Sequence, residues 1–433
     1  MFTFKLKKRP YKGLFLFPLL LSALFSEKGY TPKISAIEFQ GNTKTLDYII
    51  KREIQHPLYA PLDSIRADED RNRLENLGIF SEVAWRAVPL EDGTAILTFT
   101  ITESIQKTPP GALPIYGEDT GWSLAGGWVI TNFRGRNQSL GFNGSFGGID
   151  TYGIFFSDPW IFGNHVSLSF GLGRSLFKHK FLDRDIDNSW FQINFGKWFG
   201  DHIKTSVGFE LESKLYTNEK DSSEYFYVAP QTSLKYDTRD IYWNPGKGVL
   251  FSHFIHHTAG IDPKSLWTTF WKQSYSLFLT LNNDDKKLVL ALNGTVNRKW
   301  GQKEKFWLNY FGSSLTVRGW PLPDSRLYYS EEEAFRFGHE SVHASMELRQ
   351  EIIPKYATSL GAELGLVLVA FADAGVIADN WNTLNDQLSM YGTGLGIRIP
   401  FPMVDVFRID YGWGYRNGQW NSGALHWGIG QKF

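Results

Sequence analysis

Residues 407–414 read Phe-Arg-Ile-Asp-Tyr-Gly-Trp-Gly, and this stretch decides the fold. Large apolar side chains occupy every second position, and charged or small residues lie between them. Successive side chains of a β-strand point to opposite faces, so the alternation predicts a strand with one apolar and one polar face. The same period recurs over residues 166–173 and 288–293.

About 16 segments of this kind follow one another in residues 120–433, or about 20 residues for each strand with its loop. The chain also contains 16 Trp, 19 Tyr, 34 Phe and 42 Gly residues. Outer-membrane barrels carry aromatic side chains at both membrane interfaces, and only alternate residues meet lipid. The sequence therefore predicts a mainly β fold, a 16-stranded antiparallel transmembrane β-barrel over residues 120–433.

The overall composition excludes several classes of protein. Basic and acidic residues balance at 45 each, which argues against a nucleic-acid-binding protein. The absence of cysteine from the sequence excludes disulfides and thiol chemistry. No phosphate-binding loop, Gly-x-Ser-x-Gly elbow or dinucleotide fingerprint follows a strand. We therefore expect neither an enzyme nor a cofactor.

Residues 1–26 have the pattern of a secretory signal peptide. Five basic residues precede an apolar run at residues 14–25, which is too short to cross ~30 Å of hydrocarbon as a helix. A buried core helix is the alternative interpretation. No later stretch reaches 18 apolar residues, so we expect no transmembrane helix. A secreted, aromatic-rich chain of this kind is predicted to lie in a bacterial outer membrane.

Residues 33–103 differ from the rest of the chain. Strand candidates at residues 34–39, 81–88 and 95–102 surround two helical segments, giving the order β-α-α-β-β. Gly78 follows the second helix as a candidate C-cap. Residues 104–119, which include Pro109, Pro110 and Pro114, then read as a stiff linker.

The N-terminal segment resembles a POTRA (polypeptide-transport-associated) domain. Residues 34–42 read Ile-Ser-Ala-Ile-Glu-Phe-Gln-Gly-Asn, residues 77–80 read Leu-Gly-Ile-Phe, and the segment closes at Glu103. The resemblance implies a location in the periplasm. Only one copy is present, so chaperoning by several such domains is not assumed.

The barrel half resembles the BamA/TamA-type superfamily of outer-membrane assembly and translocation barrels (surface-antigen barrels). Six motifs carry the resemblance in the expected order: Asn-Phe-Arg-Gly-Arg-Asn at 132–137, Asp-Pro-Trp-Ile-Phe-Gly at 158–163, Tyr-Asp-Thr-Arg-Asp at 236–240 with Pro-Gly-Lys-Gly at 245–248, Val-Arg-Gly-Trp at 317–320, Glu-Leu-Arg at 347–349, and Phe-Ala-Asp-Ala-Gly at 371–375. Together they extend over nearly the whole chain after the signal peptide.

The fourth motif predicts a lock between a loop and the barrel wall. Strand parity turns the odd-numbered residues of 342–352, and also Glu363, Asp373 and Arg398, toward the lumen. The resemblance implies that the loop tip Val317, Arg318, Gly319 and Trp320 enters the lumen and that Arg318 binds Glu347 and Asp373. Arginine suits this role because its planar fork can hold two carboxylates. In the alternative interpretation, Arg318 is solvated and the acids pair with Arg349 and Arg398.

The two ends of the barrel predict a lateral seam. We expect the first strand, near residues 122–131, to pair with the last, residues 425–433. Glycines weaken strands, and they lie in both: Gly126 and Gly127 in the first, Gly428 and Gly430 in the last. Phe433 shares the apolar face of residues 425, 427 and 429 and resembles the terminal insertion signal of outer-membrane barrels, although Gln431 interrupts that face. A sandwich edge strand ending in Phe by chance is the alternative.

His339-Glu340-Ser341-Val342-His343 matches the His-Glu-x-x-His pattern of zinc proteases. That motif requires a helix, because four residues of strand separate the histidines by ~13 Å, whereas two ligands of one zinc lie within ~4.2 Å of each other. Since the second histidine enters a period-two strand, we expect no metal site here.

The resemblance implies that the protein inserts β-barrel proteins into the outer membrane, or translocates polypeptides across it, without ATP. Its partners would be the lipid bilayer, unfolded barrel or secreted clients, and accessory periplasmic or lipoprotein subunits. Two alternatives stay open, a secretion pore for one soluble partner and a passive pore or structural barrel.

Overall fold

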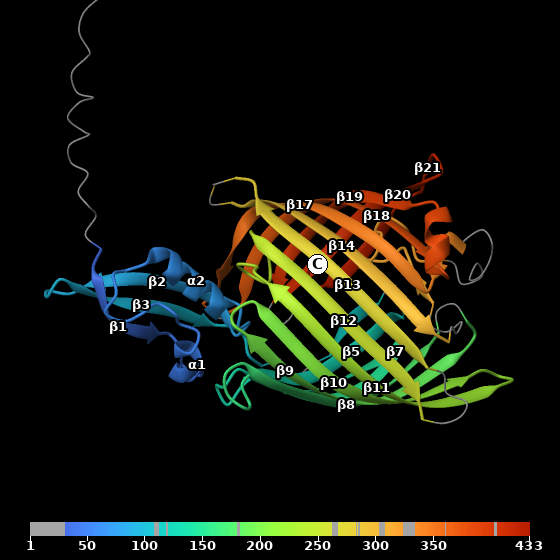
Figure 1. Cartoon of the computed structure of the whole chain (residues 1–433), viewed down its shortest axis with the longest axis horizontal. Coiled ribbons are helices and arrows are strands. Elements are labelled where there is room, and N and C mark those ends of the chain that lie inside the picture. The colour runs from blue at the N-terminus through green and yellow to red at the C-terminus, as the bar shows by residue number, and fades with distance from the viewer. Residues whose placement is uncertain are drawn as a thin grey trace, which may run out of the picture.

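The structure is a computed structural model that describes residues 31–107, 112–117, 120–179, 182–261, 267–282, 284, 286–302, 308–323, 334–359, 361–401 and 405–433. The signal peptide predicted at residues 1–26 lies outside the described residues. Figure 1 shows a small domain at one end of a large barrel.

The small domain has the predicted order of elements, with a three-stranded sheet of order β1-β3-β2 in which β1 runs parallel to β3. Its elements are β1 (Lys33–Gln40), α1 (Asp47–Lys51), α2 (Ser64–Glu75), β2 (Phe80–Pro89) and β3 (Thr94–Glu103). Helix α2 begins where the Asp63 carboxylate accepts the N–H groups of Ile65 and Arg66 at 3.0 and 3.1 Å. It is followed by Gly78 in the left-handed region, at φ +71°.

Glu103, the last residue of β3, fixes the end of the small domain through hydrogen bonds. Its carboxylate accepts the backbone N–H and hydroxyl of Thr45, both at 2.7 Å, and the N–H of Lys44 at 3.0 Å. Partial burial acts to raise the pKa of Glu103, but these hydrogen bonds outweigh it and hold the pKa below its usual value. The end of β3 is thereby tied to the loop before α1.

The barrel follows as a series of antiparallel strands, each hydrogen-bonded to its neighbours in the chain (Figure 1). The strands are β4 (Ala112–Gly117), β5 (Gly121–Phe133), β6 (Gln138–Gly147), β7 (Ile149–Asp158), β8 (Val166–Lys178), β9 (Asp185–Phe199), β10 (Ile203–Thr217), β11 (Ser222–Asp237), β12 (Gly248–Gly260), β13 (Thr268–Thr280), β14 (Leu288–Gly301), β17 (Glu340–Ala357), β18 (Glu363–Ala378), β19 (Met390–Phe401), β20 (Asp405–Arg416), β21 (Gln419–Trp420) and β22 (Ala424–Ile429). The short strands β15 (Asn309–Tyr310) and β16 (Phe337–Gly338) pair with each other in the long loop between β14 and β17.

The strand number agrees with the predicted 16. Among the described residues the barrel sheet has 17 strands, but β21 and β22 both pair with β20 and are two parts of one strand. The described residues contain no helix that is both long enough and apolar enough to cross a membrane.

The predicted start of the barrel is wrong. β4 lies inside residues 104–119, which were expected to be a linker, and it pairs with β5 through Ala112–Gly126 to Gly117–Gly121. Residues 122–131 therefore belong to the second strand and not to the first. The sequence pattern did not reveal β4 because Pro114, which has no N–H for a sheet ladder, argues against a strand at this position.

Strand parity is confirmed on the wall that carries the lock motifs. Along β17, the even-numbered side chains from Ala344 to Leu348 are exposed, whereas the odd-numbered ones from His343 to Glu351 are buried. On β18, Asp373 is buried, and on β19 Arg398 is fully buried. The polar set thus faces the lumen and the apolar set faces outward.

The small domain contacts the turns at one end of the barrel. Leu46 donates its N–H to the Gly135 carbonyl at 3.0 Å, and Asn132 donates to the Thr45 hydroxyl at 2.8 Å. Arg52 lies over the Trp160 ring at 4.2 Å. These contacts account for two of the motifs, residues 132–137 and 158–163, which form the turns that receive the small domain.

Candidate functional site: a loop locked into the barrel lumen

The lock acids come from three of four consecutive strands, β17, β18 and β20, with β19 between the last two. Glu347 on β17 lies opposite Phe371 on β18, and Asp373 follows Phe371 by two residues on the same inward face. On β20, Asp410 lies opposite Gly396 of β19. Small residues on β19 leave the space between these carboxylates open, because a side chain at Gly396 would collide with Asp410.

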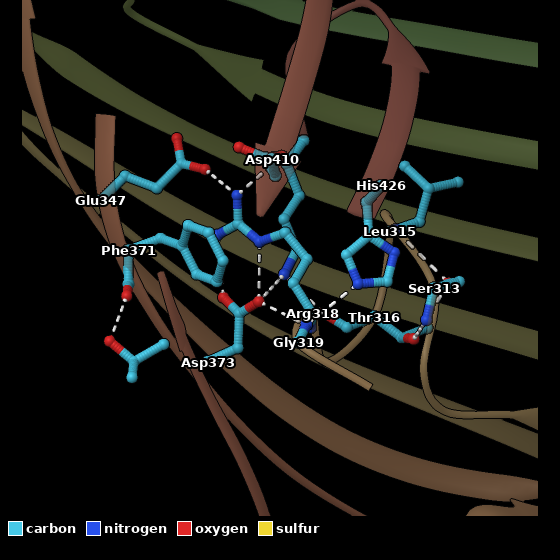
Figure 2. A network of polar contacts seen from close by, with 12 residues as sticks. Ser313, Leu315, Thr316, Arg318, Gly319, Glu347, Phe371, Asp373, Asp410 and His426 are labelled. Atoms are coloured by element: carbon cyan, nitrogen blue, oxygen red, sulfur yellow. Dashed lines mark hydrogen bonds and ion pairs between the residues drawn. The ribbon is translucent and has the colours of Figure 1, made fainter. Parts of the chain in front are cut away.

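Arg318 fills that space, as Figure 2 shows. Its Nη1 donates to Glu347 at 2.6 Å and to Asp410 at 3.2 Å. Its Nε and Nη2 donate to the two oxygens of Asp373 at 2.8 and 3.0 Å, a bidentate pair. Arg318 is 0% exposed, so the alternative of a solvated loop residue does not describe it.

An aromatic ring supports the same guanidinium. The Cζ atom of Arg318 lies 3.7 Å from the centroid of the Phe371 ring, in Figure 2 beside the ion pairs. A guanidinium over a ring face is attracted by the ring quadrupole. The Phe-Ala-Asp motif therefore supplies both the ring and the carboxylate that hold Arg318.

Other basic residues of the wall share the acids. Glu347 also accepts Arg349 Nε at 2.8 Å and Arg398 Nη2 at 3.1 Å. The pairs expected in the alternative interpretation thus coexist with Arg318. The network joins five basic side chains to three carboxylates: Arg318, Arg349, Arg398, Arg408 and Lys432 with Glu347, Asp373 and Asp410. None of these eight side chains is more than 3% exposed.

The rest of the loop tip is held by backbone contacts and packing. Gly319 has φ +86°, and an added Cβ would lie 2.6 Å from the Trp413 carbonyl carbon, so only glycine fits. Its carbonyl accepts Asn421 Nδ2 at 2.8 Å, and Trp320 Nε1 donates to the Tyr391 carbonyl at 2.8 Å. Val317 packs in a buried cluster with Phe311, Ile377 and Met390.

The structure brings Val317, Arg318, Gly319, Trp320, Glu347 and Asp373 together, while the role of this cluster as a functional lock stays a prediction. The prediction missed Asp410, His426 and Lys432. Asp410 alternates with outward residues 409 and 411, so parity alone could have placed it inward.

The seam residues are arranged differently from the prediction. Gly126 and Gly127 lie in β5, between β4 and β6, and so do not face the last strand. Gly428 lies in β22, opposite Arg408. Phe433 does not share the outward face: β22 ends at Ile429, Gly430 turns the chain at φ +79°, and Phe433 packs beside Phe278.

The histidine motif lies at the start of β17. His339 precedes the strand and His343 lies within it, buried with its ring 5.8 Å from that of Phe311. Glu340 pairs with Arg298 at 3.0 Å. Within the described ranges, no group of three or more His, Asp and Glu side chains is placed to hold a metal ion.

Each of the two domains matches a known protein family. The Omp85 superfamily domain matches residues 132–433, and the POTRA family, described as the surface antigen variable number repeat, matches residues 32–104. The chain is 29% identical over 415 residues to the outer membrane protein assembly factor BamA of Neisseria meningitidis serogroup B. That alignment covers 84% of this chain and 49% of the relative, so the chain spans about half the length of that protein.

Solved structures share the fold. BamA from Haemophilus ducreyi lacking POTRA domains 1–3 gives a TM-score of 0.56 at 16% identity, covering 92% of this chain and 83% of that one. CdiB from Escherichia coli gives a TM-score of 0.58 at 12% identity, covering 92% and 76%. The domain match over residues 132–433, more than half of the sequence, together with the POTRA domain before it, shows that the chain belongs to the Omp85 superfamily.

Proposed function

We propose that this protein assembles β-barrel clients into the bacterial outer membrane without hydrolysing a nucleotide, with its POTRA domain in the periplasm. Assembly or translocation at the outer membrane is the function that the superfamily supports. The finer assignment to assembly rests on the strands where the barrel begins and ends.

Those two strands are much shorter than the others. The strand order places β22 beside β4, and within the described residues each has six residues. Every other barrel strand, the fragment β21 aside, has between 10 and 18 residues. A short seam has few ladder hydrogen bonds to break.

Opening such a seam would expose two strand edges inside the bilayer. Unpaired N–H and C=O groups are costly in hydrocarbon, so an exposed edge is a strong template for an incoming strand. Pairing at a strand edge depends only weakly on the amino-acid sequence of the client, because the main chain supplies the hydrogen bonds. In this proposal the loop bound to β17, β18 and β20 holds the wall beside the seam in place until the seam opens.

A second candidate, secretion of a soluble polypeptide through the lumen, is favoured by a cavity of about 910 Å³. It lies between loop residues 308–316 and the wall, and its lining is rich in hydroxyl and amide groups such as those of Ser169, Asn194 and Ser252. Neutral polar groups suit a path for hydrated polypeptide.

Depletion of the protein in its native cell distinguishes the candidates. Under the assembly proposal, unfolded outer-membrane barrels accumulate in the periplasm and their folded forms decline together. Loss of one secreted protein, with barrels unaffected, would favour the secretion candidate. Steady conductance in lipid bilayers with no change in either class would favour a passive pore. The same survey, combined with mild cross-linking, would identify clients and accessory lipoproteins.

A further inference from the structure

The segment after β22 turns into the lumen. Gly430, at φ +79°, donates its N–H to the Val406 carbonyl at 2.7 Å, which redirects the chain away from the outward face of Ile429. Gln431 then donates to the Trp243 carbonyl at 2.8 Å. We call residues 430–433 the tail segment.

Lys432 of the tail segment binds the acid that also holds the loop. Its ammonium donates to Asp373 Oδ2 at 2.7 Å and to the carbonyl of Thr316, two residues before Arg318. The same Oδ2 atom accepts Arg318 Nε at 2.8 Å and the Arg318 N–H at 3.0 Å. The Lys432 side chain is 3% exposed, so little water reaches its charge, and these hydrogen-bond partners stabilise the charge instead.

The neighbouring residues of the same strand and tail reinforce this contact. On β22, His426 Nε2 accepts the N–H of Gly319 at 3.0 Å, a contact visible in Figure 2. At the tail, the Phe433 ring lies 6.3 Å from that of Phe278 on β13, and Arg349 lies over it at 5.1 Å. The tail segment is therefore packed on the wall on one side and on the loop tip on the other.

We infer that Lys432 and His426 are positioning residues that join the loop tip to the last barrel strand. Any outward movement of β22 that carries its tail must break the bonds of Lys432 to Asp373 and Thr316 and that of His426 to Gly319. Release of the loop removes partners from the tail in the same way. The lock and the strand at the seam therefore hold each other in place, and a ligand or client that frees one weakens the other, since coupling between two sites is reciprocal.

This inference deepens the proposed function, because it links the lock to the seam, but its test needs no client. The natural sequence contains no cysteine, so a single cysteine at Ser314, a loop residue only 9% exposed, reports loop release through its rate of maleimide labelling. Lys432→Met keeps the length of the side chain and removes its charge. We expect Lys432→Met to raise the labelling rate about tenfold, which corresponds to about 1.4 kcal/mol, and Lys432→Arg to restore most of the protection.

The matched control is Lys178→Met, because the Lys178 side chain is 68% exposed and pairs with exposed Asp183 at 2.9 Å. It should leave the labelling rate unchanged. Reciprocally, Arg318→Met should speed amide exchange in β22 but not in β9, on the far wall. In the double variant Arg318→Met/Lys432→Met, labelling should rise by less than the product of the two single effects.

Three results would overturn the inference: unchanged labelling in Lys432→Met, labelling effects that multiply in the double variant, or β22 exchange unaffected by Arg318→Met. If Lys432→Met fails to fold, His426→Leu, which removes the acceptor of Gly319, carries the same labelling and exchange tests with the same expected results. Because neither readout involves assembly, a negative depletion survey would reject the proposed function and leave this inference standing.

Discussion

The lock contains more basic groups than acidic ones, and this predicts which substitution damages it most. Five basic side chains share three carboxylates, and Nη1 of both Arg349 and Arg408 lacks a hydrogen-bond partner among the described residues. Removal of an acid increases the excess, to five against two. Removal of Arg318 reduces it, to four against three.

The contacts give the magnitudes. Removing one partner of a buried ion pair costs about 3–5 kcal/mol. Arg318→Ala leaves each acid with another cation, since Asp373 keeps Lys432 at 2.7 Å and Asp410 keeps Arg398 at 2.7 Å. We place its loss of unfolding free energy near the lower end, about 3 kcal/mol. Glu347→Gln deprives Arg318, Arg349 and Arg398 of a charged acceptor at once, and we expect about 5 kcal/mol.

The assay is urea unfolding in lipid vesicles, followed by heat-modifiability on semi-native gels. The matched control is Glu219→Gln, which removes a carboxylate from an exposed turn and should change nothing. We predict that Glu347→Gln lowers the free energy of unfolding more than Arg318→Ala does, by about 2 kcal/mol. An equal or larger loss in Arg318→Ala would refute the idea that excess positive charge dominates the cluster.

Three further predictions test other parts of the structure. Gly319→Ala should displace the loop and lower the free energy of unfolding by at least about 1–3 kcal/mol. Gly200→Ala, at φ +62° with open space around it, should show only the smaller backbone strain. The unfolding midpoints of the two variants on semi-native gels compare these effects. Burial, aided by the charge of Arg52, lowers the pKa of His165 from 6.5 to about 4. The contribution of neutral His165 to docking of the POTRA domain is therefore present above pH 6.5 and is lost as the pH falls toward 4. Amide exchange of residues 44–53 at pH 7.5 and 5 measures this loss, and a His165→Phe variant should remove the difference between the two pH values. Asp63→Ala should cost the POTRA domain about 1 kcal/mol through loss of the α2 N-cap, measured by its local amide exchange; no change in exchange would contradict the capping role.

Alternation and motif order predicted the architecture because side-chain parity in a strand depends only on which face meets lipid. They placed Glu347, Asp373 and Arg398 inward correctly for the same reason. Parity failed where the backbone leaves the regular strand. Gly430 turns the chain inward, so Phe433 could not be placed by extending the pattern of residues 425–429.

Other features depend on contacts between distant parts of the sequence. The network around Arg318 includes His426 and Lys432 through the fold of the tail and loop, and no local pattern marks such partners. β4 was missed because six residues containing a proline give too short an alternation to recognise. Short strands at the seam are therefore visible only in the structure, although the proposed function depends on them.

The most direct test of the account measures client folding by the purified protein in lipid vesicles. Cysteine pairs placed along β4 and β22 close the seam under oxidation and release it on reduction, without interference from native thiols. We predict that the reduced protein accelerates folding of a urea-denatured outer-membrane barrel and that the oxidised protein does not. Equal acceleration by both forms would contradict an opening seam.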